Sequence, residues 1–409
     1  MKQREFDVIV WGASGFTGRL VVEYLISAYG VDGELKWAIA GRSQEKLEQL
    51  RGKYLADKQQ AALPIFIADS QDEKSLAELV GKTRVLCSTV GPYALYGTTV
   101  VAACVAAGTH YCDLTGEVHW MAKNIPVYQQ AAEASGARIV HTCGFDSIPF
   151  DLGVWFLQNA MQEKHGVAAI HVKGRVSHMS ATASGGTIAS ILAMMEAASS
   201  DPSIRRIMGD PYSLNPEGAE KGPDTPDQRG ALYDPDFDQW TAPFIMAAVN
   251  TRVVRRSNAL LGFPWGSDFC YEESILCRSR YSAVRDTLGT GLGMVALALG
   301  PTRKLAARLL PKPGEGPSRK AREAGFYEIF FHGVHPDDRS KDIRVKVCGD
   351  MDPGYGSTSK MIAEAAVCLA VDEIDVAGGF WTPASAMKEK LINRLVSNAG
   401  LTFKIISTS

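Results

Sequence analysis

The chain has 409 residues, of which 46% are hydrophobic and 22% charged, as in an ordinary globular protein. This length favours two domains, and a net charge of −2 gives no general basic excess for binding nucleic acid. The eight cysteines form no C-x-x-C pair and no compact cluster with histidine. We therefore expect reduced thiols in a cytoplasmic protein and no metal site.

The first 145 residues alternate between strand and helix patterns. The expected strands cover 6–11, 35–40, 65–68, 84–90, 110–113 and 138–142, and the expected helices cover 16–28, 43–56, 75–80 and 98–107. Strands and helices that alternate in this way predict a doubly wound parallel sheet of the Rossmann type. We predict a dinucleotide-binding domain over residues 1–145.

A glycine-rich turn separates the first strand from the first helix. Its residues are Gly12, Ala13, Ser14, Gly15, Phe16, Thr17 and Gly18. The glycines allow a sharp turn, a close approach of the backbone to a pyrophosphate, and tight packing of the helix on the sheet. The free N–H groups of the first helical turn favour negative charge. This motif predicts the pyrophosphate site of a dinucleotide cofactor.

The ends of the next strands indicate which dinucleotide binds. Arg42 and Ser43 follow the second strand, where an NAD enzyme usually carries an acidic residue, so we predict NADP(H). The alternative for Arg42 is a solvated surface arginine. Asp69 closes the third strand and is expected at the adenine edge, unless it is ordinary loop sequence. The residues expected on the nicotinamide side of the cofactor are Val90, Gly91, Pro92 and Tyr93.

From residue 146 onward the pattern changes to polar and apolar residues in alternation. The expected strands cover 169–179, 246–254, 268–276, 326–334 and 343–347, and the expected helices cover 186–199 and 357–371. This pattern predicts an α+β substrate domain over residues 146–409 with a mixed or antiparallel sheet. Residues 209–238 are rich in proline, glycine and aspartate and are expected to form a long surface loop, either static or acting as a lid.

The segment 288–310 starts with the apolar run LGTGLGMVALAL and continues with Arg303, Lys304 and Arg308. The apolar run is too short to span a bilayer, which takes ~20 residues. Two interpretations stay open. The segment is either a buried helix or an amphipathic contact with a membrane or lipid surface, which its basic residues would favour.

Several longer motifs occur together in this chain. They are GASGFTGRLVVEYL at 12–25, IAGRS at 39–43, STVGPYALYG at 88–97, CGFDSIPFDLG at 143–153, GG at 185–186, NTRVVRRSNAL at 250–260, KPGEGPSRK at 312–320 and WTPASAM at 381–387. In these motifs the chain resembles the saccharopine dehydrogenase-like oxidoreductases, and most closely their trans-acting enoyl reductase branch. The resemblance implies an NADP-binding domain, a substrate domain, and reduction of a carbon–carbon double bond in a polyketide or fatty-acyl chain carried by a synthase.

An enoyl reductase needs a hydrogen-bond donor at the thioester oxygen and a proton source at the α carbon. The candidates are Tyr93 and Tyr96 on the nicotinamide side, and Asp146 and Ser147 after the last strand of the first domain, where the chain enters the second. Each also has a structural interpretation, in which Tyr96 packs, Ser147 caps the next helix and Asp146 anchors the loop. Asp113 and Glu117 are further acid–base candidates.

Candidates in the second part of the chain are fewer. His178 is either a packed histidine or a catalyst. Arg252, Arg255 and Arg256 either bind a phosphopantetheine phosphate or an acidic carrier face, or protect a solvated strand edge.

Two further functions stay open beside the enoyl reductase. One is an amine or imine oxidoreductase, and the other is a non-catalytic nucleotide-binding protein at a lipid surface. A homodimer is compatible with all three.

Overall fold

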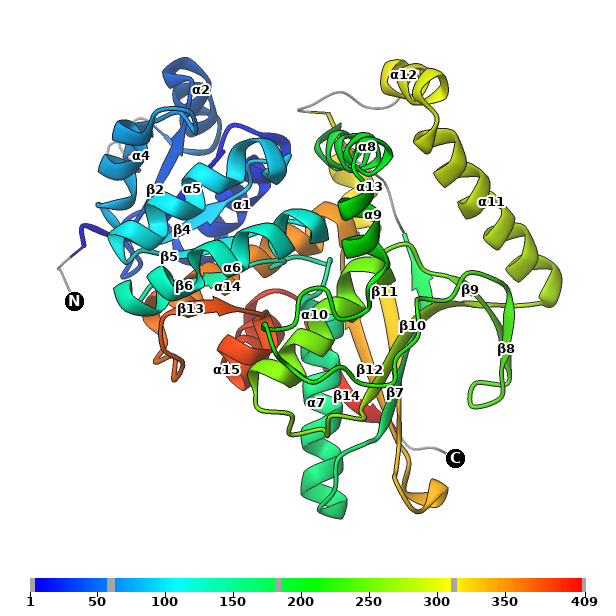
Figure 1. Ribbon diagram of the computed structural model, residues 1–409. Helices are drawn as coiled ribbons and strands as arrows, with labels where there is room; N and C mark the ends of the chain where they lie inside the picture. The colour runs from blue at the N-terminus through cyan, green and yellow to red at the C-terminus, as the bar shows by residue number, and fades with distance from the viewer. Residues whose placement is uncertain (1–3, 57–62, 181–184, 310–314, 407–409) are drawn as a thin grey trace.

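The computed structural model describes residues 4–56, 63–180, 185–309 and 315–406. Two β-sheets organise the chain, one formed mainly by its first third and the other mainly by its second half (Figure 1). Helices cover both faces of the first sheet, and helix α7 (Ile148–His165) leads from this sheet to the second.

The first sheet is parallel and contains seven strands within the described residues. In spatial order they are β13 (Gly379–Trp381), β6 (Arg138–Val140), β5 (His110–Asp113), β4 (Thr83–Ser88), β1 (Phe6–Trp11), β2 (Trp37–Gly41) and β3 (Ile65–Ile67). The strand order reverses between β1 and β4. A crevice opens beyond the carboxyl ends of the strands at such a reversal. The order confirms the predicted Rossmann-type sheet.

Two helical layers bury the first sheet. One layer consists of α4 (Glu73–Val80), α5 (Tyr93–Ala107) and α6 (Val118–Ser135); the other contains α1 (Phe16–Tyr29), α2 (Gln44–Tyr54) and α14 (Thr358–Val371). The strands read as continuous apolar runs because side chains on both of their faces are buried, as the FDVIVW run of β1 shows.

The C-terminal part of the chain returns to the first sheet. Strand β13 pairs in parallel with β6, and α14 packs against α1, β4 and β5. Helix α15 (Pro383–Asn398) then packs on α14 and α7. The first sheet therefore includes a strand from beyond the boundary expected at 145/146. This strand, β13, covers an edge of β6 that would otherwise stay unpaired.

The second sheet is mixed, as predicted, and also has seven strands within the described ranges. In spatial order they are β14 (Leu401–Ile406), β12 (Ile343–Gly349), β11 (Tyr327–Val334), β7 (His171–Met179), β10 (Cys270–Cys277), β9 (Gln239–Pro243) and β8 (Leu232–Asp234). Strands β7 and β10 are parallel and the other pairs are antiparallel. Helix α7 packs on β11, β12 and β14 and buries one face of this sheet.

Shorter elements connect these layers. They are α8 (Gly185–Ser200), α9 (Pro202–Gly209), α10 (Ala247–Leu260), α11 (Arg280–Ala298), α12 (Gly300–Leu309), α13 (Arg319–Glu323), a 3₁₀ turn (Arg339–Lys341) and a π turn (Pro353–Ser357). The strand expected at 246–254 is wrong, because these residues belong to α10. Its apolar residues Val249 and Val253 are four positions apart and are buried on one helical face.

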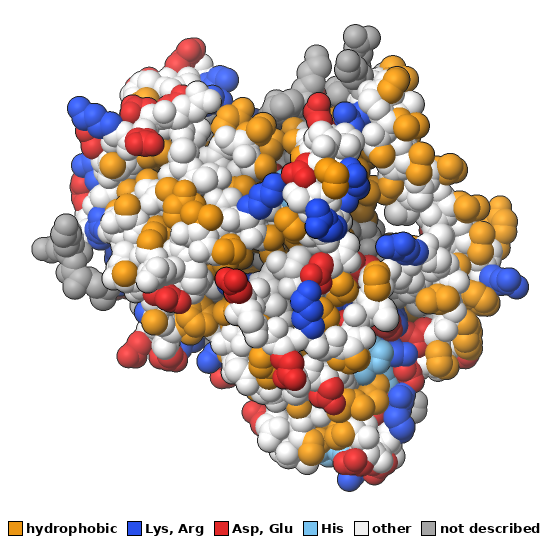
Figure 2. Space-filling model, in the orientation of Figure 1, with side chains coloured by type: hydrophobic (Ala, Val, Ile, Leu, Met, Phe, Trp, Pro, Cys, Tyr) orange, Lys and Arg blue, Asp and Glu red, His pale blue; other side chains and the backbone are white. Residues whose placement is uncertain are grey.

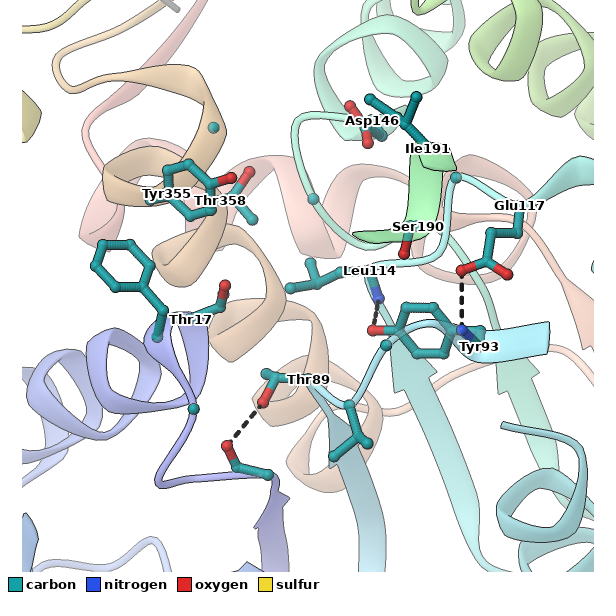
Figure 3. Close-up of a pocket in the computed structure, with 18 of the residues that line it drawn as sticks. Thr17, Thr89, Tyr93, Leu114, Glu117, Asp146, Ser190, Ile191, Tyr355 and Thr358 are labelled. Carbon is teal, nitrogen blue, oxygen red and sulfur yellow. Dashed lines mark hydrogen bonds between the residues drawn. The ribbon is translucent and has the colours of Figure 1, made fainter. Parts of the chain in front are cut away.

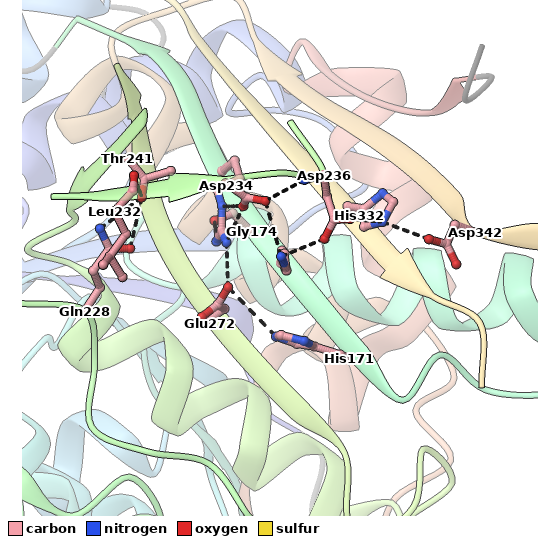
Figure 4. A network of polar contacts seen from close by, with 12 residues as sticks. His171, Gly174, Gln228, Leu232, Asp234, Asp236, Thr241, Glu272, His332 and Asp342 are labelled. Carbon is pink, nitrogen blue, oxygen red and sulfur yellow. Dashed lines mark hydrogen bonds and ion pairs between the residues drawn. The ribbon is translucent and has the colours of Figure 1, made fainter. Parts of the chain in front are cut away.

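The loop expected at 209–238 is fastened to its surroundings. Its last part forms β8, and a network of charged side chains holds Asp234 and Asp236 on the second sheet (Figure 4). Arg175 donates from Nε to Asp234 Oδ2 over 2.8 Å, and Lys173 Nζ lies 2.6 Å from Asp236 Oδ2. Such partly buried ion pairs bind the segment firmly, which argues against a freely moving lid.

The apolar segment expected at 288–310 lies mostly in α11 and α12, and Leu310 lies outside the described residues. The buried-helix interpretation is wrong, because Ala283 is the one buried side chain among the described residues of α11. In the described part of the chain, the helices are too short or too polar to cross a bilayer.

Candidate functional site

A cavity of about 1090 Å³ lies beyond the carboxyl ends of the first sheet (Figure 3). The glycine-rich turn and the ends of β2, β3, β4 and β5 form one wall. Helices α8, α10 and α11 contribute to the opposite wall, and the π turn at Pro353–Ser357 closes one end. The cavity is therefore at the reversal of strand order, where open α/β sheets bind their ligands.

The glycine-rich turn brings backbone, rather than side chains, to the cavity. Gly12 has a φ of 84°, and a Cβ atom there would lie 2.5 Å from Val90 Cγ2. A Cβ atom at Gly18 would overlap the carbonyl oxygen of Gly12. Thr89 Oγ1 fixes the turn by donating to the Trp11 and Gly12 carbonyls over 3.1 and 3.3 Å.

The helix that follows this turn has an open N-terminus. No side chain caps α1 at Gly15, and its first turn contains no acidic residue. The N–H groups of this turn are available to an anion, which the helix dipole also favours. Residues of the turn that line the cavity are Gly12, Ser14, Gly15, Phe16 and Thr17, whereas Ala13 and Gly18 pack behind them. The arrangement fits the diphosphate of a dinucleotide.

One end of the cavity is lined by cations. Arg42 is exposed at the cavity wall and makes no hydrogen bond or ion pair with other described residues, so its guanidinium is available to a ligand. Ser43 Oγ caps α2 by accepting from the N–H of Lys46, and Lys46 also lines the cavity. Asp69 lines the same end. Lys46 was not among the residues predicted from the sequence, although its position in the first turn of α2 places it near Arg42.

The other end of the first wall is formed by Val90, Gly91 and Tyr93. Pro92 is the N-cap of α5 and does not itself line the cavity. The Tyr93 hydroxyl donates to the Ser88 carbonyl over 3.2 Å and accepts from the Leu114 N–H over 3.1 Å. Burial raises the pKa of Tyr93 well above its usual value. This hydroxyl holds two strand ends together and is not free to donate to a substrate.

Glu117 and Tyr96 lie close to this end. The Glu117 carboxylate accepts from the N–H groups of Tyr93 and Ala94 over 2.8 and 2.9 Å, so it caps α5. Burial is the main cause that raises the pKa of Glu117. Tyr96 is partly buried in the cavity wall, and its hydroxyl has no hydrogen-bond partner among the described residues. Tyr96 rather than Tyr93 thus offers a donor to the cavity.

Asp146 places a carboxyl group on the cavity wall without a partner. It forms no hydrogen bond or ion pair within the described residues, and burial alone raises its pKa to about 7. A carboxyl group in this state can hold a proton at neutral pH and release it. Asp146 and Ile191 on α8 both line the cavity, as Figure 3 shows. These two residues are more than 40 positions apart in the sequence.

Ser147 supports Asp146 instead of lining the cavity. Its φ of 118° is rare for a residue other than glycine, and its buried hydroxyl donates to Asn250 Oδ1 over 3.2 Å. Asn250 Nδ2 in turn donates to Glu273 Oε2 over 3.0 Å, and burial raises the pKa of Glu273 to about 8. This chain of hydrogen bonds holds the backbone that carries Asp146.

Methionine side chains dominate the wall opposite the first sheet. Half of the 12 methionines in the chain line the cavity: Met179, Met194, Met195, Met208, Met246 and Met294. Ile191, Ile245 and Val249 extend this apolar surface. Methionine is unbranched and adapts its shape readily, so this wall suits a flexible apolar ligand.

Other sequence candidates lie away from the cavity. Asp113 is fully buried and binds His141 Nδ1 over 2.7 Å, which is a structural role. His178 is half exposed beside Glu328. Groups of three or more side chains suited to a metal ion are absent from the described part of the chain.

Both interpretations of the α10 arginines are wrong. Arg252, Arg255 and Arg256 are only 2–4% exposed. Arg252 pairs with Asp227, Arg255 Nε donates to Asp224 Oδ2 over 2.5 Å, and Arg256 donates to the Phe380 carbonyl over 2.8 Å. These guanidinium groups fasten the preceding loop and β13 to α10, so none is free for a phosphate or a carrier surface.

Comparison with known proteins agrees with this geometry. Residues 8–140 match the saccharopine dehydrogenase NADP-binding domain. A Mycobacterium tuberculosis protein assigned as a trans-acting enoyl reductase is 41% identical over 407 residues, and the trans-acting enoyl reductase of Mycobacterium ulcerans is 36% identical over 412 residues; both alignments cover 96% of each chain. The saccharopine dehydrogenase (L-Glu forming) of Saccharomyces cerevisiae shares the fold, with a TM-score of 0.51 at 11% identity and coverage of 98% of this chain and 99% of that one.

The family match and the glycine-rich turn agree on the cofactor, which is NADP(H). The near-complete coverage shows that the likeness extends over both sheets. The chain is therefore an NADP(H)-dependent oxidoreductase and belongs to the family of the trans-acting enoyl reductases.

Proposed function

We propose that this protein reduces the carbon–carbon double bond of an α,β-unsaturated acyl chain, as a trans-acting enoyl reductase of polyketide or fatty-acyl intermediates. The observation that carries the proposal is the methionine-lined wall of the cavity, which faces the strand ends where the nicotinamide half of a dinucleotide belongs. The names of the relatives support the same reaction.

The proposed cofactor site has three parts. The open N-terminus of α1 and the glycine-rich turn receive the diphosphate. Arg42, Lys46 and Ser43 receive the 2′-phosphate, with Asp69 at the adenine edge. Val90 and Gly91 contact the nicotinamide side.

Bound NADPH would supply the hydride that adds to the β carbon of the substrate, and would thereby be oxidised to NADP⁺. The Asp146 carboxyl group, protonated near neutral pH, donates the proton to the α carbon and becomes a carboxylate. The Tyr96 hydroxyl is the proposed donor to the thioester oxygen, where negative charge develops. One hydride and one proton thus add across the double bond.

The cavity argues against an amino-acid substrate. The carboxylate of such a substrate needs a cation, yet the only basic side chains among the described lining residues are Arg42 and Lys46, at the 2′-phosphate end. An imine reductase acting on apolar imines remains the second candidate, because the apolar wall fits such substrates as well. Delivery of the acyl chain by a carrier protein and formation of a homodimer stay predictions.

NADPH consumption by the purified protein, measured with enoyl thioesters of increasing chain length and with apolar imines, tests the proposal. We expect turnover of enoyl thioesters that rises with chain length, because longer chains cover more of the methionine wall. Turnover of imines alone would exclude enoyl reduction.

The roles of the named residues need separate measurements. The rate with wild-type protein should fall as the pH rises through about 7, where Asp146 loses its proton. Asp146→Asn should reduce kcat by about 10²–10⁴-fold and remove this pH dependence. Unchanged kcat in this variant would exclude Asp146 as the proton donor.

Arg42→Ala should weaken NADPH binding by at least about tenfold and leave NADH binding nearly unchanged. Lys74→Ala, an exposed lysine on α4 that does not line the cavity, is the matched control. Equal losses for both cofactors would show that Arg42 does not bind the 2′-phosphate.

A further inference from the structure

Helix α11 exposes an apolar stripe along its whole length. The large apolar side chains exposed by 40% or more recur at intervals of three or four residues: Tyr281, Val284, Leu288, Leu292, Val295 and Leu299. These intervals place them on one face of the helix. Figure 1 shows α11 at the periphery of the molecule, and Figure 2 shows hydrophobic side chains along this outer edge.

The sequence of α11 is too weak a helix former to leave this face in water. Gly289, Gly291 and Gly293 lie within little more than one helical turn, and a Cβ atom at any of them would meet nothing within 4 Å. Each glycine costs about 1 kcal/mol relative to alanine inside a helix. Tertiary packing normally compensates for such costs. Among the described residues of α11, however, Ala283 alone has a buried side chain, so we infer that another surface covers the helix.

The distribution of charge indicates what covers it. None of the 16 residues from Thr287 to Thr302 is charged. Beyond them the sequence contains the basic residues Arg303, Lys304, Arg308 and Lys312 and no acidic residue before Glu315, and the Arg303 guanidinium lies 3.9 Å from Glu196 on α8. A protein partner would be expected to meet a polar rim around the apolar stripe. An uncharged stripe followed by basic residues instead matches a lipid surface with anionic headgroups.

We propose that α11 docks on an anionic membrane surface, with the exposed stripe in the apolar boundary of the bilayer. Met294 lies on another face of α11 and lines the cavity. Helix α8, which packs on α11, contributes Ser190, Ile191 and Met194 to the same wall. Docking thus places the apolar cavity wall next to lipid. The passage of an acyl chain from lipid into the cavity rests on the proposed function, whereas the docking itself does not.

Sedimentation of the full-length protein with phosphatidylcholine vesicles, with and without phosphatidylglycerol, tests the docking. Wild-type protein should bind vesicles that contain phosphatidylglycerol and bind pure phosphatidylcholine more weakly. A Leu288→Glu/Leu292→Glu variant should lose at least about tenfold in binding, since it puts charge into the stripe. Val127→Glu, on an equally exposed apolar residue of α6, should bind like wild type.

Three results would overturn the proposal. The first is wild-type protein that stays in solution with both kinds of vesicle. The second is a glutamate double variant that binds as well as wild type. The third is a dimer in sedimentation velocity without vesicles that the double variant converts to a monomer, because the stripe would then cover a second copy. NADPH titration of each variant keeps this test separate from the proposed function, because cofactor binding should be unchanged in all of them.

Discussion

Helices α10 and α11 reverse the usual relation between polarity and burial. Arg252, Arg255 and Arg256 on α10 are almost completely buried, whereas Leu292 and Val295 on α11 are 70% and 58% exposed. The difference lies in the partners that the fold supplies. The loop before α10 provides Asp224, Asp227 and backbone carbonyls for the guanidinium groups, whereas the described residues provide α11 with hardly any apolar partners. Burial thus follows from what a side chain meets in three dimensions.

The largest effect is expected when a partner on α10 is removed. Arg255→Ala leaves the Asp224 carboxylate, which is 8% exposed, without its cation. We expect the free energy of unfolding, measured in urea, to fall by about 3–5 kcal/mol. Arg278→Ala, at an exposed position after β10, should change it by less than about 0.5 kcal/mol. Equal small losses in both variants would refute a structural role for the α10 arginines.

A carboxyl group without a partner should behave in the opposite way. Burial raises the pKa of Asp146 above its value in the unfolded chain, so its contribution to stability is present at low pH and is lost as the pH rises through about 7. Asp146→Asn removes this loss. We expect the variant to exceed wild type by about 4 kcal/mol at pH 8, since each unit of the pKa shift corresponds to about 1.4 kcal/mol, and the difference to vanish near pH 4. A variant less stable than wild type at pH 8 would show that the carboxylate has a partner.

A smaller effect is expected in α11 itself. Gly291→Ala adds a methyl group in open space and raises helix propensity. We expect amide exchange in this helix to slow by about two- to fivefold, which corresponds to roughly 0.5–1 kcal/mol. Gly166→Ala, at a left-handed position after α7 with equally open surroundings, should not stabilise the protein. Unchanged exchange after Gly291→Ala would indicate that α11 is not helical without a covering surface.

The smallest effect is expected for Leu292→Glu in the absence of vesicles. Because this side chain is mostly exposed, the free energy of unfolding should change by less than about 0.5 kcal/mol. Val253→Glu, on the buried face of α10, is the contrasting variant and should prevent stable folding. A large loss for Leu292→Glu would place its side chain in a protein contact and contradict the exposed stripe.

The cofactor half of the molecule could be predicted because its signals are local. Strand, glycine-rich turn and helix follow one another within about 20 residues of sequence, and Arg42 ends the next strand. The alternation of polar and apolar residues likewise predicted the mixed second sheet. A period of two or of 3.6 residues is a property of each segment alone, so it can be recognised without knowing the neighbours.

Sequence by itself determined the doubly wound sheet, its glycine-rich turn and the cation beside β2, because backbone geometry and short-range spacing fix these features. Only the tertiary structure decided that β13 joins the first sheet, that three arginines are buried in α10, and that six methionines from distant segments form one wall. Segments that far apart meet through packing, and their ion pairs and apolar contacts exist only once the fold has brought them together.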